Sequence, residues 1–126
     1  GATARDCIID DKLDRVIFII NKGEMGLAIG KNGASINKTQ KMVRKDVELV
    51  EYSDDPKKFI INALNSKFIM DVRLSEKVDG TKIAVVMVDH NRKGAIVGRN
   101  GKNAEKARLL CRRYFQISNV HIVTKE

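Results

Sequence analysis

The chain has 126 residues, 43% of them hydrophobic, and its 24 Lys and Arg against 16 Asp and Glu give a net charge of +8. This hydrophobic content is typical of a globular protein, no apolar run approaches the roughly 18 residues that span a bilayer, and the first residues do not resemble a secretory signal. Composition therefore predicts a cytoplasmic protein without a membrane partner, whose ligands are acidic. The length fits one domain or two units of about 55 to 70 residues.

Cysteine and histidine residues give no indication of catalysis. Cys7 and Cys111 lie far apart, without a CxxC or His/Cys cluster, and both are expected to be reduced thiols in the core. His90 and His121 have no obvious Ser, Cys or carboxylate partner in the sequence, and the paired aspartates lie in expected turns. We therefore expect no enzymatic activity, no cofactor and no metal site.

The first half of the chain predicts strands rich in Ile, Val and Phe, followed by two helices and a third strand. Their expected order is strand 6–9, strand 13–20, helix 24–29, helix 34–45 and strand 47–52. The longer helix is expected to turn apolar residues inward and lysines outward, namely Ile36, Met42 and Val43 against Lys38, Lys41 and Lys45.

The second half predicts the same order of elements behind one additional helix. Capping residues precede Pro56, which suits the first position of that helix. The expected elements are helix 55–66, strands 68–74 and 82–88, helix 103–115 and strand 120–123. The last helix should place Ala104, Ala107, Cys111 and Tyr114 on one side. No residues upstream of the first strand could form the leading helix of the first half, so either the sequence is trimmed or the first module is incomplete.

A glycine-rich segment occurs twice. Gly26 to Gly33 (GLAIGKNG) aligns without gaps, 68 positions on, with Gly94 to Gly101 (GAIVGRNG). The segments around them hold the excess positive charge, with six cations against one acid in 22–45, eight against one in 92–113, and ten against fourteen elsewhere. The chain is therefore interpreted as a tandem of one module with a surface for a polyanion.

Each glycine pair permits positive φ and close approach of the backbone to a ligand, and the following helix offers amides to a phosphate. Lys31 and Arg99 add positive charge inside the loops. The alternative is a tight helix–turn–helix with glycine caps and no ligand, which two copies with basic second helices make less favourable. A nucleotide-binding P-loop fits poorly, because it needs four residues between its glycines and a Ser or Thr after the lysine.

Two strands before each GxxG loop and one after it, together with GKNG and GRNG, resemble the KH domain in its type II arrangement. More narrowly, the two segments resemble the paired KH region of the NusA family of transcription elongation and termination factors, most closely its short archaeal form. The resemblance covers the whole chain. It implies an α+β fold of two type II KH domains in rigid tandem, 1–53 and 54–126, each a three-stranded mixed sheet with helices on one face.

The same resemblance implies binding of single-stranded RNA, with about four nucleotides held at each loop. The implied phosphate clamps are Gly30, Lys31, Asn32, Gly33, Gly98, Arg99, Asn100 and Gly101. The implied groove and its flanking cations are Ile29, Ile36, Val97, Lys38, Lys41, Lys102 and Lys106. Taken singly, Ile36 and Val97 fit a core position equally well.

The expected partners of this monomer are single-stranded RNA and, as an open possibility, RNA polymerase. Two alternatives stay open. The first is a KH protein of ribosome or RNA-processing machinery. The second is a protein-interaction scaffold for polymerase, in which the net negative charge outside segments 22–45 and 92–113 faces a basic partner.

Overall fold

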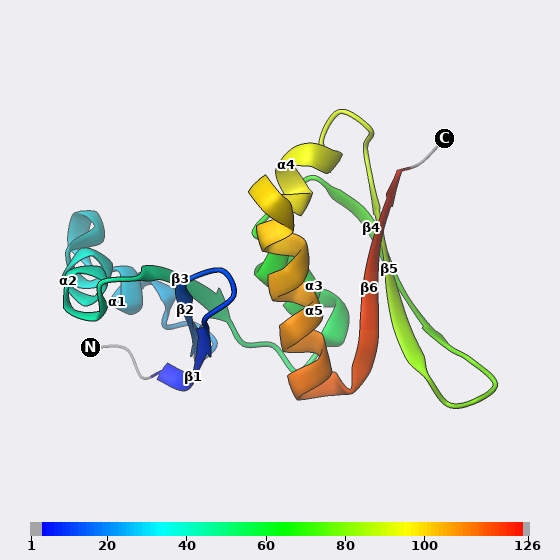
Figure 1. The fold of residues 1–126 in the computed structure, drawn as a ribbon, viewed down its shortest axis with the longest axis horizontal. Helices are drawn as coiled ribbons and strands as arrows, with labels where there is room; N and C mark the ends of the chain where they lie inside the picture. The colour runs from blue at the N-terminus through cyan, green and yellow to red at the C-terminus, as the bar shows by residue number, and fades with distance from the viewer. Residues whose placement is uncertain (1–3, 125–126) are drawn as a thin grey trace. The chain divides into compact units, whose positions relative to one another are not determined.

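The computed structural model describes residues 4–124, apart from the side chain of Asn32, and the chain divides into two compact units, 1–53 and 54–126 (Figure 1). Unit 1 contains β1 (Ala4–Asp10), β2 (Arg15–Ile20), α1 (Met25–Ile29), the 3-10 helix η1 (Lys31–Gly33), α2 (Ala34–Val43) and β3 (Asp46–Glu51). Unit 2 contains α3 (Pro56–Leu64), β4 (Ile69–Glu76), β5 (Lys82–Val88), α4 (Lys93–Val97), η2 (Arg99–Gly101), α5 (Lys102–Phe115) and β6 (Ile117–Thr124). The predicted α+β class with two three-stranded mixed sheets is confirmed.

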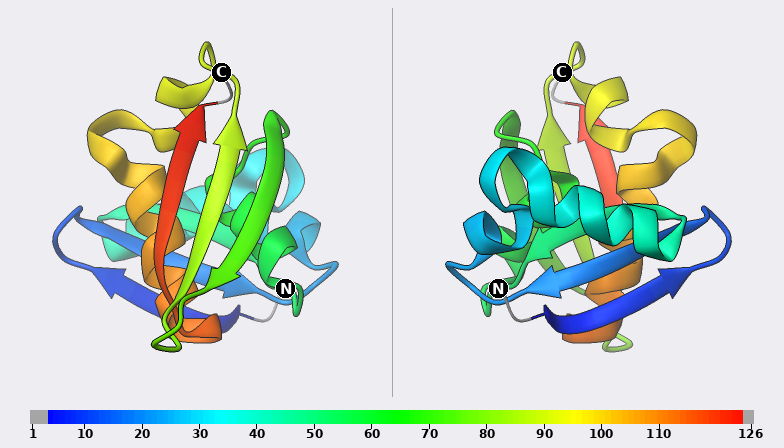
Figure 2. Two further views of the ribbon diagram at one scale, coloured as in Figure 1. Left: turned by 90° about the vertical axis from the view of Figure 1, so that its right-hand side faces the viewer. Right: turned by 90° about the vertical axis from the view of Figure 1, so that its left-hand side faces the viewer.

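The two sheets have the same topology. In unit 1 the order is β1-β2-β3, with β2 antiparallel to β1 and parallel to β3. In unit 2 the order is β4-β5-β6, again with one antiparallel and one parallel pair (Figure 2, left). Both antiparallel pairs are irregular at the same place, between Ala4 and Asp6 and between Ile69 and Asp71. The repetition seen in the glycine loops therefore extends to a bulge in the strands before them.

Helices lie on one face of each sheet. In unit 1, α1 and α2 cover the sheet (Figure 2, right), and α2 contacts α1, η1 and β3. In unit 2, α5 packs against β6 and also against α3. Asp55 caps α3 by accepting a hydrogen bond from the Lys57 backbone N–H at 3.0 Å, and Phe59 of α3 meets the rings of Tyr114 and Phe115 edge-on, each at 5.5 Å between centroids.

Equivalent positions in the two units differ in burial. The apolar space between the helices and the sheet of unit 1 is a hollow of about 320 Å³, whose lining includes Phe18, Ile36 and Leu49, all half-buried. The counterparts of Phe18 and Ile36, 68 positions on, are Val86 and Ala104, and both are buried. Unit 2 contains α3, which packs on α5 and β4, whereas the described part of unit 1 has no such helix.

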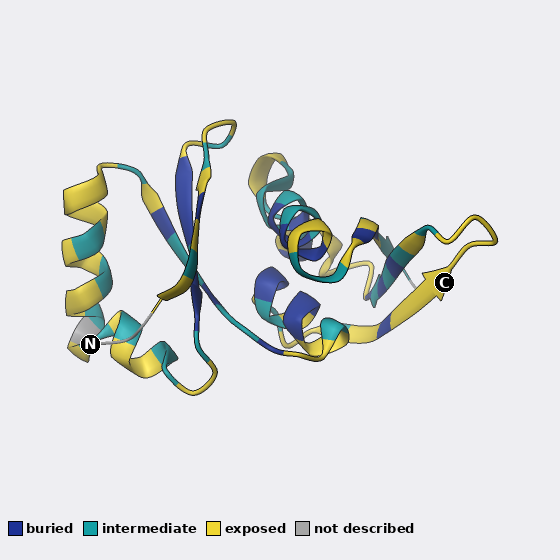
Figure 3. Cartoon of the chain, turned by 90° about the horizontal axis from the view of Figure 1, so that it is seen from below, coloured by how far each residue is buried: buried dark blue, intermediate teal, exposed yellow. Residues whose placement is uncertain are grey.

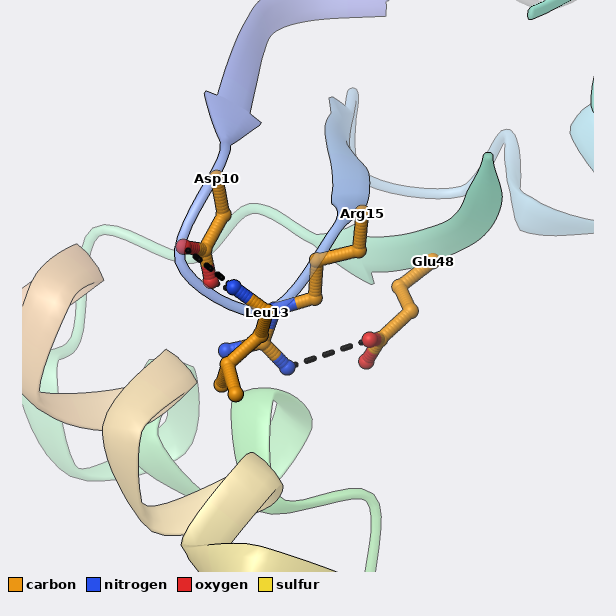
Figure 4. Close-up of polar contacts among 4 residues, drawn as sticks. All are labelled: Asp10, Leu13, Arg15 and Glu48. Atoms are coloured by element: carbon orange, nitrogen blue, oxygen red, sulfur yellow. Dashed lines mark hydrogen bonds and ion pairs between the residues drawn. The ribbon is translucent and has the colours of Figure 1, made fainter. Parts of the chain in front are cut away.

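A buried ion cluster joins the three strands of unit 1 (Figure 4). The guanidinium of Arg15 is fully buried, and its Nε and Nη1 lie 2.8 Å from Asp10 Oδ2 and 3.1 Å from Glu48 Oε2. Asp10 Oδ1 also accepts a hydrogen bond from the Leu13 backbone N–H at 3.3 Å, in the turn between β1 and β2. One cation therefore joins the start of β2 to the end of β1 and to β3.

Two burial predictions are wrong. Met42 and Val43, expected inward, are 74% and 36% exposed, and α2 has no buried residue (Figure 3). The helix ends at Val43 because Arg44 is left-handed (φ 57), so these two side chains lie in its last turn. Cys7, expected in the core, is exposed because β1 is an edge strand, paired on one side only. Cys111 is buried as expected, and burial raises the pKa of its thiol to about 12.

Element ends differ from the sequence prediction by a few residues. The second strand begins at Arg15 rather than at residue 13, because residues 11–14 form the turn and Asp14 is left-handed (φ 52). The last strand is longer than expected, Ile117–Thr124, since it pairs along the whole of β5. Within the described residues, none of the helices is long and apolar enough to cross a membrane.

Candidate nucleic-acid interface

The two GxxG loops have nearly the same backbone conformation. The first glycines, Gly30 and Gly98, have φ/ψ of 76/173 and 84/164, and the second, Gly33 and Gly101, have 77/14 and 72/17. All four φ angles lie in the region that side chains disfavour. In both loops the backbone N–H of the first glycine donates a hydrogen bond to the carbonyl oxygen four residues earlier, at 3.0 Å. The backbone N–H of the second glycine donates to the carbonyl oxygen of the first, at 3.2 Å in the first loop and 3.1 Å in the second.

The first glycine of each loop is also closely packed. A Cβ on Gly30 would lie 2.6 Å from Ser35 Oγ and 2.8 Å from the Ser35 amide nitrogen. A Cβ on Gly98 would lie 3.0 Å from the amide nitrogen of Asn103, the equivalent residue. The second glycines have no such contact, since the nearest atom to a Cβ on Gly33 is 3.6 Å away and Gly101 has nothing within 4 Å. The start of the second helix thus lies directly against each loop.

The residues inside the loops face solvent. Lys31, Arg99 and Asn100 are exposed, and Asn100 has φ 58. Asparagine tolerates this left-handed conformation better than most side chains. Each loop therefore presents an exposed cation beside half-buried glycines, which suits contact with a phosphate.

The predicted groove residues are less uniform. Ile29 is exposed, Ile36 and Val97 are half-buried, and the buried residue of α4 is Ile96. Ile36 and Val97 thus lie between core and surface, and Ile36 also lines the hollow between the helices and the sheet of unit 1. No side chain of α1 is buried, whereas α4 inserts Ile96 into unit 2.

Among the flanking cations, Lys38 and Lys41 are exposed and Lys102 is half-buried. Lys106, expected on the RNA surface, is only 4% exposed. The buried residues of α5 are Ala104, Lys106, Ala107, Leu110 and Cys111, so Lys106 lies within the buried stripe of this helix. Lys106 is therefore removed from the candidate interface.

A groove of about 590 Å³ lies between α2 and the β1–β2 turn, and of its polar residues only Lys41 was predicted from the sequence as part of the interface. Its lining is Leu13, Asp14, Asn37, Gln40, Lys41, Arg44, Lys45 and Asp46. The spacing of 37, 40, 41 and 44 on a helix is the pattern that could have revealed this face, but without a motif it is read as an ordinary solvated face. The lining combines cations and carboxamides from α2 with Leu13, Asp14 and Asp46.

The described residues contain no group of three or more His, Cys, Asp or Glu side chains that could hold a metal ion.

A family model described as the KH domain matches residues 1–76 of the chain. The matched residues cover unit 1 and continue through α3 to Glu76 at the end of β4, so the second GxxG loop lies beyond them. A solved structure described as the crystal structure of APE1850 is similar with a TM-score of 0.88 and 36% identity, over 98% of this chain and 88% of that one.

Curated relatives come from archaea. The "Probable transcription termination protein NusA" of Halococcus morrhuae is 37% identical over 122 residues, which are 97% of this chain and 85% of that protein. The protein of the same name from Methanocaldococcus jannaschii is 32% identical over 120 residues, which are 95% of this chain and 64% of that protein.

Proposed function

The chain belongs to the KH domain family and to its NusA-like archaeal members, and from this premise we propose that it binds single-stranded RNA through both GxxG loops. Each unit acts as one KH domain, and the protein serves as a NusA-like factor in transcription elongation or termination. The loops hold backbone phosphates, while the helices beside them face the bases.

The observation that most supports this proposal is the repeated loop geometry. Two segments 68 positions apart keep the same φ and ψ at both glycines, and in each the first glycine is packed against the next helix. A glycine cap alone would explain one positive φ in a loop, but not a second copy with an exposed cation at the same place. Close backbone approach and positive charge are the two requirements of a phosphate clamp.

Placing acids in either loop should weaken RNA binding at least about tenfold, or about 1.4 kcal/mol, because negative charge then faces the phosphates. The variants are Lys31→Asp with Asn32→Asp, and Arg99→Asp with Asn100→Asp. Aspartate tolerates the left-handed conformation seen at Asn100, so the fold should be kept. Affinity is measured by fluorescence anisotropy with a labelled single-stranded RNA, and circular dichroism checks the fold.

A matched control carries the same change of charge away from the loops. Lys77→Asp with Val78→Asp changes the exposed turn between β4 and β5, where Val78 is fully exposed. This variant should bind RNA nearly as wild type does. Equal binding by wild type and both loop variants would remove the clamp assignment.

Salt dependence separates RNA binding from the protein-scaffold alternative. If about four to six phosphates are neutralised, the logarithm of the association constant should fall against the logarithm of salt concentration with a slope of about −3 to −4. A slope of this size is expected because the excess positive charge of segments 22–45 and 92–113 would displace counterions from the RNA phosphates. A titration of RNA binding at several salt concentrations gives the slope, and a slope near zero would favour the scaffold reading.

We further propose that the two KH domains form a rigid tandem. The Tyr52 backbone N–H donates to the Ile20 carbonyl at 2.8 Å, which extends the pairing of β3, and Asp55 caps α3. Between these two anchored residues lie only Ser53 and Asp54. A connection this short cannot act as a flexible tether, so one RNA strand is expected to contact both loops.

A further inference from the structure

The face of α2 that borders the groove continues directly from the first GxxG loop. Asn37, Gln40, Lys41 and Arg44, here called the α2 stripe, line the groove and are all exposed. Asn37 Nδ2 lies 3.6 Å from the position of a Cβ on Gly33, so its carboxamide is beside the second glycine of the loop. The opposite wall includes Leu13 and Asp14 of the β1–β2 turn.

The side chains of the α2 stripe make no hydrogen bond or ion pair with another residue in the described part of the chain. Lys45, at the edge of the same groove, differs because its Nζ lies 3.2 Å from Asp11 Oδ1 and 4.0 Å from Asp14 Oδ1. A carboxamide offers two donor hydrogens and an acceptor oxygen, the combination that pairs with the edge of a base. The carboxamides of Asn37 and Gln40 can therefore donate to and accept from a ligand without first breaking a hydrogen bond to the protein.

The corresponding residues of unit 2 are engaged with the protein. Sixty-eight positions on from Asn37 and Gln40 are Glu105 and Arg108. Arg108 Nη1 lies 2.7 Å from Glu105 Oε1, and its Nε donates to the Val120 carbonyl at 3.2 Å. The two side chains neutralise each other's charge. At the positions where unit 1 has two carboxamides, unit 2 therefore has none.

We propose that the two units contribute differently to recognition: Asn37 and Gln40 of unit 1 read base edges, while unit 2 binds phosphates without reading bases at this position. The inference rests on the proposed RNA binding. Phosphate contacts position a strand but are the same for every sequence, so discrimination requires contacts to bases. From Asn37 to Arg44 the helix rises about 10 Å, close to the length of four stacked nucleotides. Lys41 and Arg44 then hold the backbone while the carboxamides meet the bases.

The test transplants the unit 2 pair into unit 1, by Asn37→Glu with Gln40→Arg. The double change keeps the net charge and gives two exposed residues three positions apart, which should pair with each other. A pool of random RNAs of about 12 nucleotides is first enriched on the wild-type protein, and affinity is measured for the enriched sequence and its scramble. Wild type should prefer the enriched sequence by on the order of tenfold or more. The transplant variant should lose that preference while binding the scramble within about twofold of wild type.

The unit 2 loop variant, Arg99→Asp with Asn100→Asp, is the control. It should weaken binding of both RNAs by similar factors and leave the preference unchanged, since phosphates are common to both. The proposal is overturned if wild type enriches no sequence, if the transplant variant keeps the preference, or if the unit 2 variant abolishes it. If wild type binds the random pool in a direct titration, the proposed function stands in each of those outcomes. Failure of wild type to bind either RNA would instead refute the proposed function.

Discussion

Replacing Arg15 with alanine should lower the free energy of unfolding by about 3 to 5 kcal/mol, because it leaves carboxylates without their cation. The guanidinium is fully buried, and the side chains of Asp10 and Glu48 that it contacts are only 10% and 15% exposed. Three strands lose their common contact, since Asp10 ends β1, Arg15 begins β2 and Glu48 lies in β3. Urea unfolding followed by circular dichroism gives the change.

An exposed pair of the same chemistry provides the control. Arg73 Nε lies 3.0 Å from Asp71 Oδ2, and the two side chains are 71% and 48% exposed. Hydrogen bonding to Arg73 lowers the pKa of Asp71, but water screens this pair, so Arg73→Ala should have a far smaller effect than Arg15→Ala. Comparable losses in the two variants would show that the cluster around Arg15 does not stabilise the sheet.

The glycine loops were predictable because glycine is the residue that positive φ demands. Four such angles recur at Gly30, Gly33, Gly98 and Gly101, and their spacing in the sequence indicated the turns. Strands rich in Ile and Val were predicted nearly to their ends, since β-branched residues on a half-buried sheet leave few alternatives. Local chemistry was sufficient for both features.

Features that depend on distant packing were not predictable. Lys106 is charged and was assigned to the surface, but it is only 4% exposed. Arg15 reads as an ordinary strand residue until Glu48, 33 positions away, is known to lie 3.1 Å from it. Asn37 and Gln40 carry no motif, and their interest comes from the groove beside them and from the Glu105–Arg108 pair in unit 2. A helical pattern gives the faces of a helix, and only the structure tells which neighbours meet each face.

The second large effect expected is a dependence of affinity on the length of the RNA. Single-stranded RNAs of about 4 to 14 nucleotides should bind with a steep rise in affinity once one strand can contact both loops. When two sites are joined rigidly, the second contact forms at high effective concentration, and the gain is typically on the order of 10² to 10⁴. The expectation rests on the proposed rigid tandem, for which the short connection at Ser53 and Asp54 is the physical reason.

The loop variants determine whether both units contribute to that rise. Lys31→Asp with Asn32→Asp should reduce the affinity of a long RNA toward that of a short one, and so should Arg99→Asp with Asn100→Asp, because either change leaves one working clamp. Anisotropy titrations of each variant against the whole length series give the comparison. Affinity that does not change with length would mean that the units bind separately. One loop variant identical to wild type at every length would instead assign RNA binding to the other unit alone, since a clamp that contributes to the shared strand cannot be removed without loss.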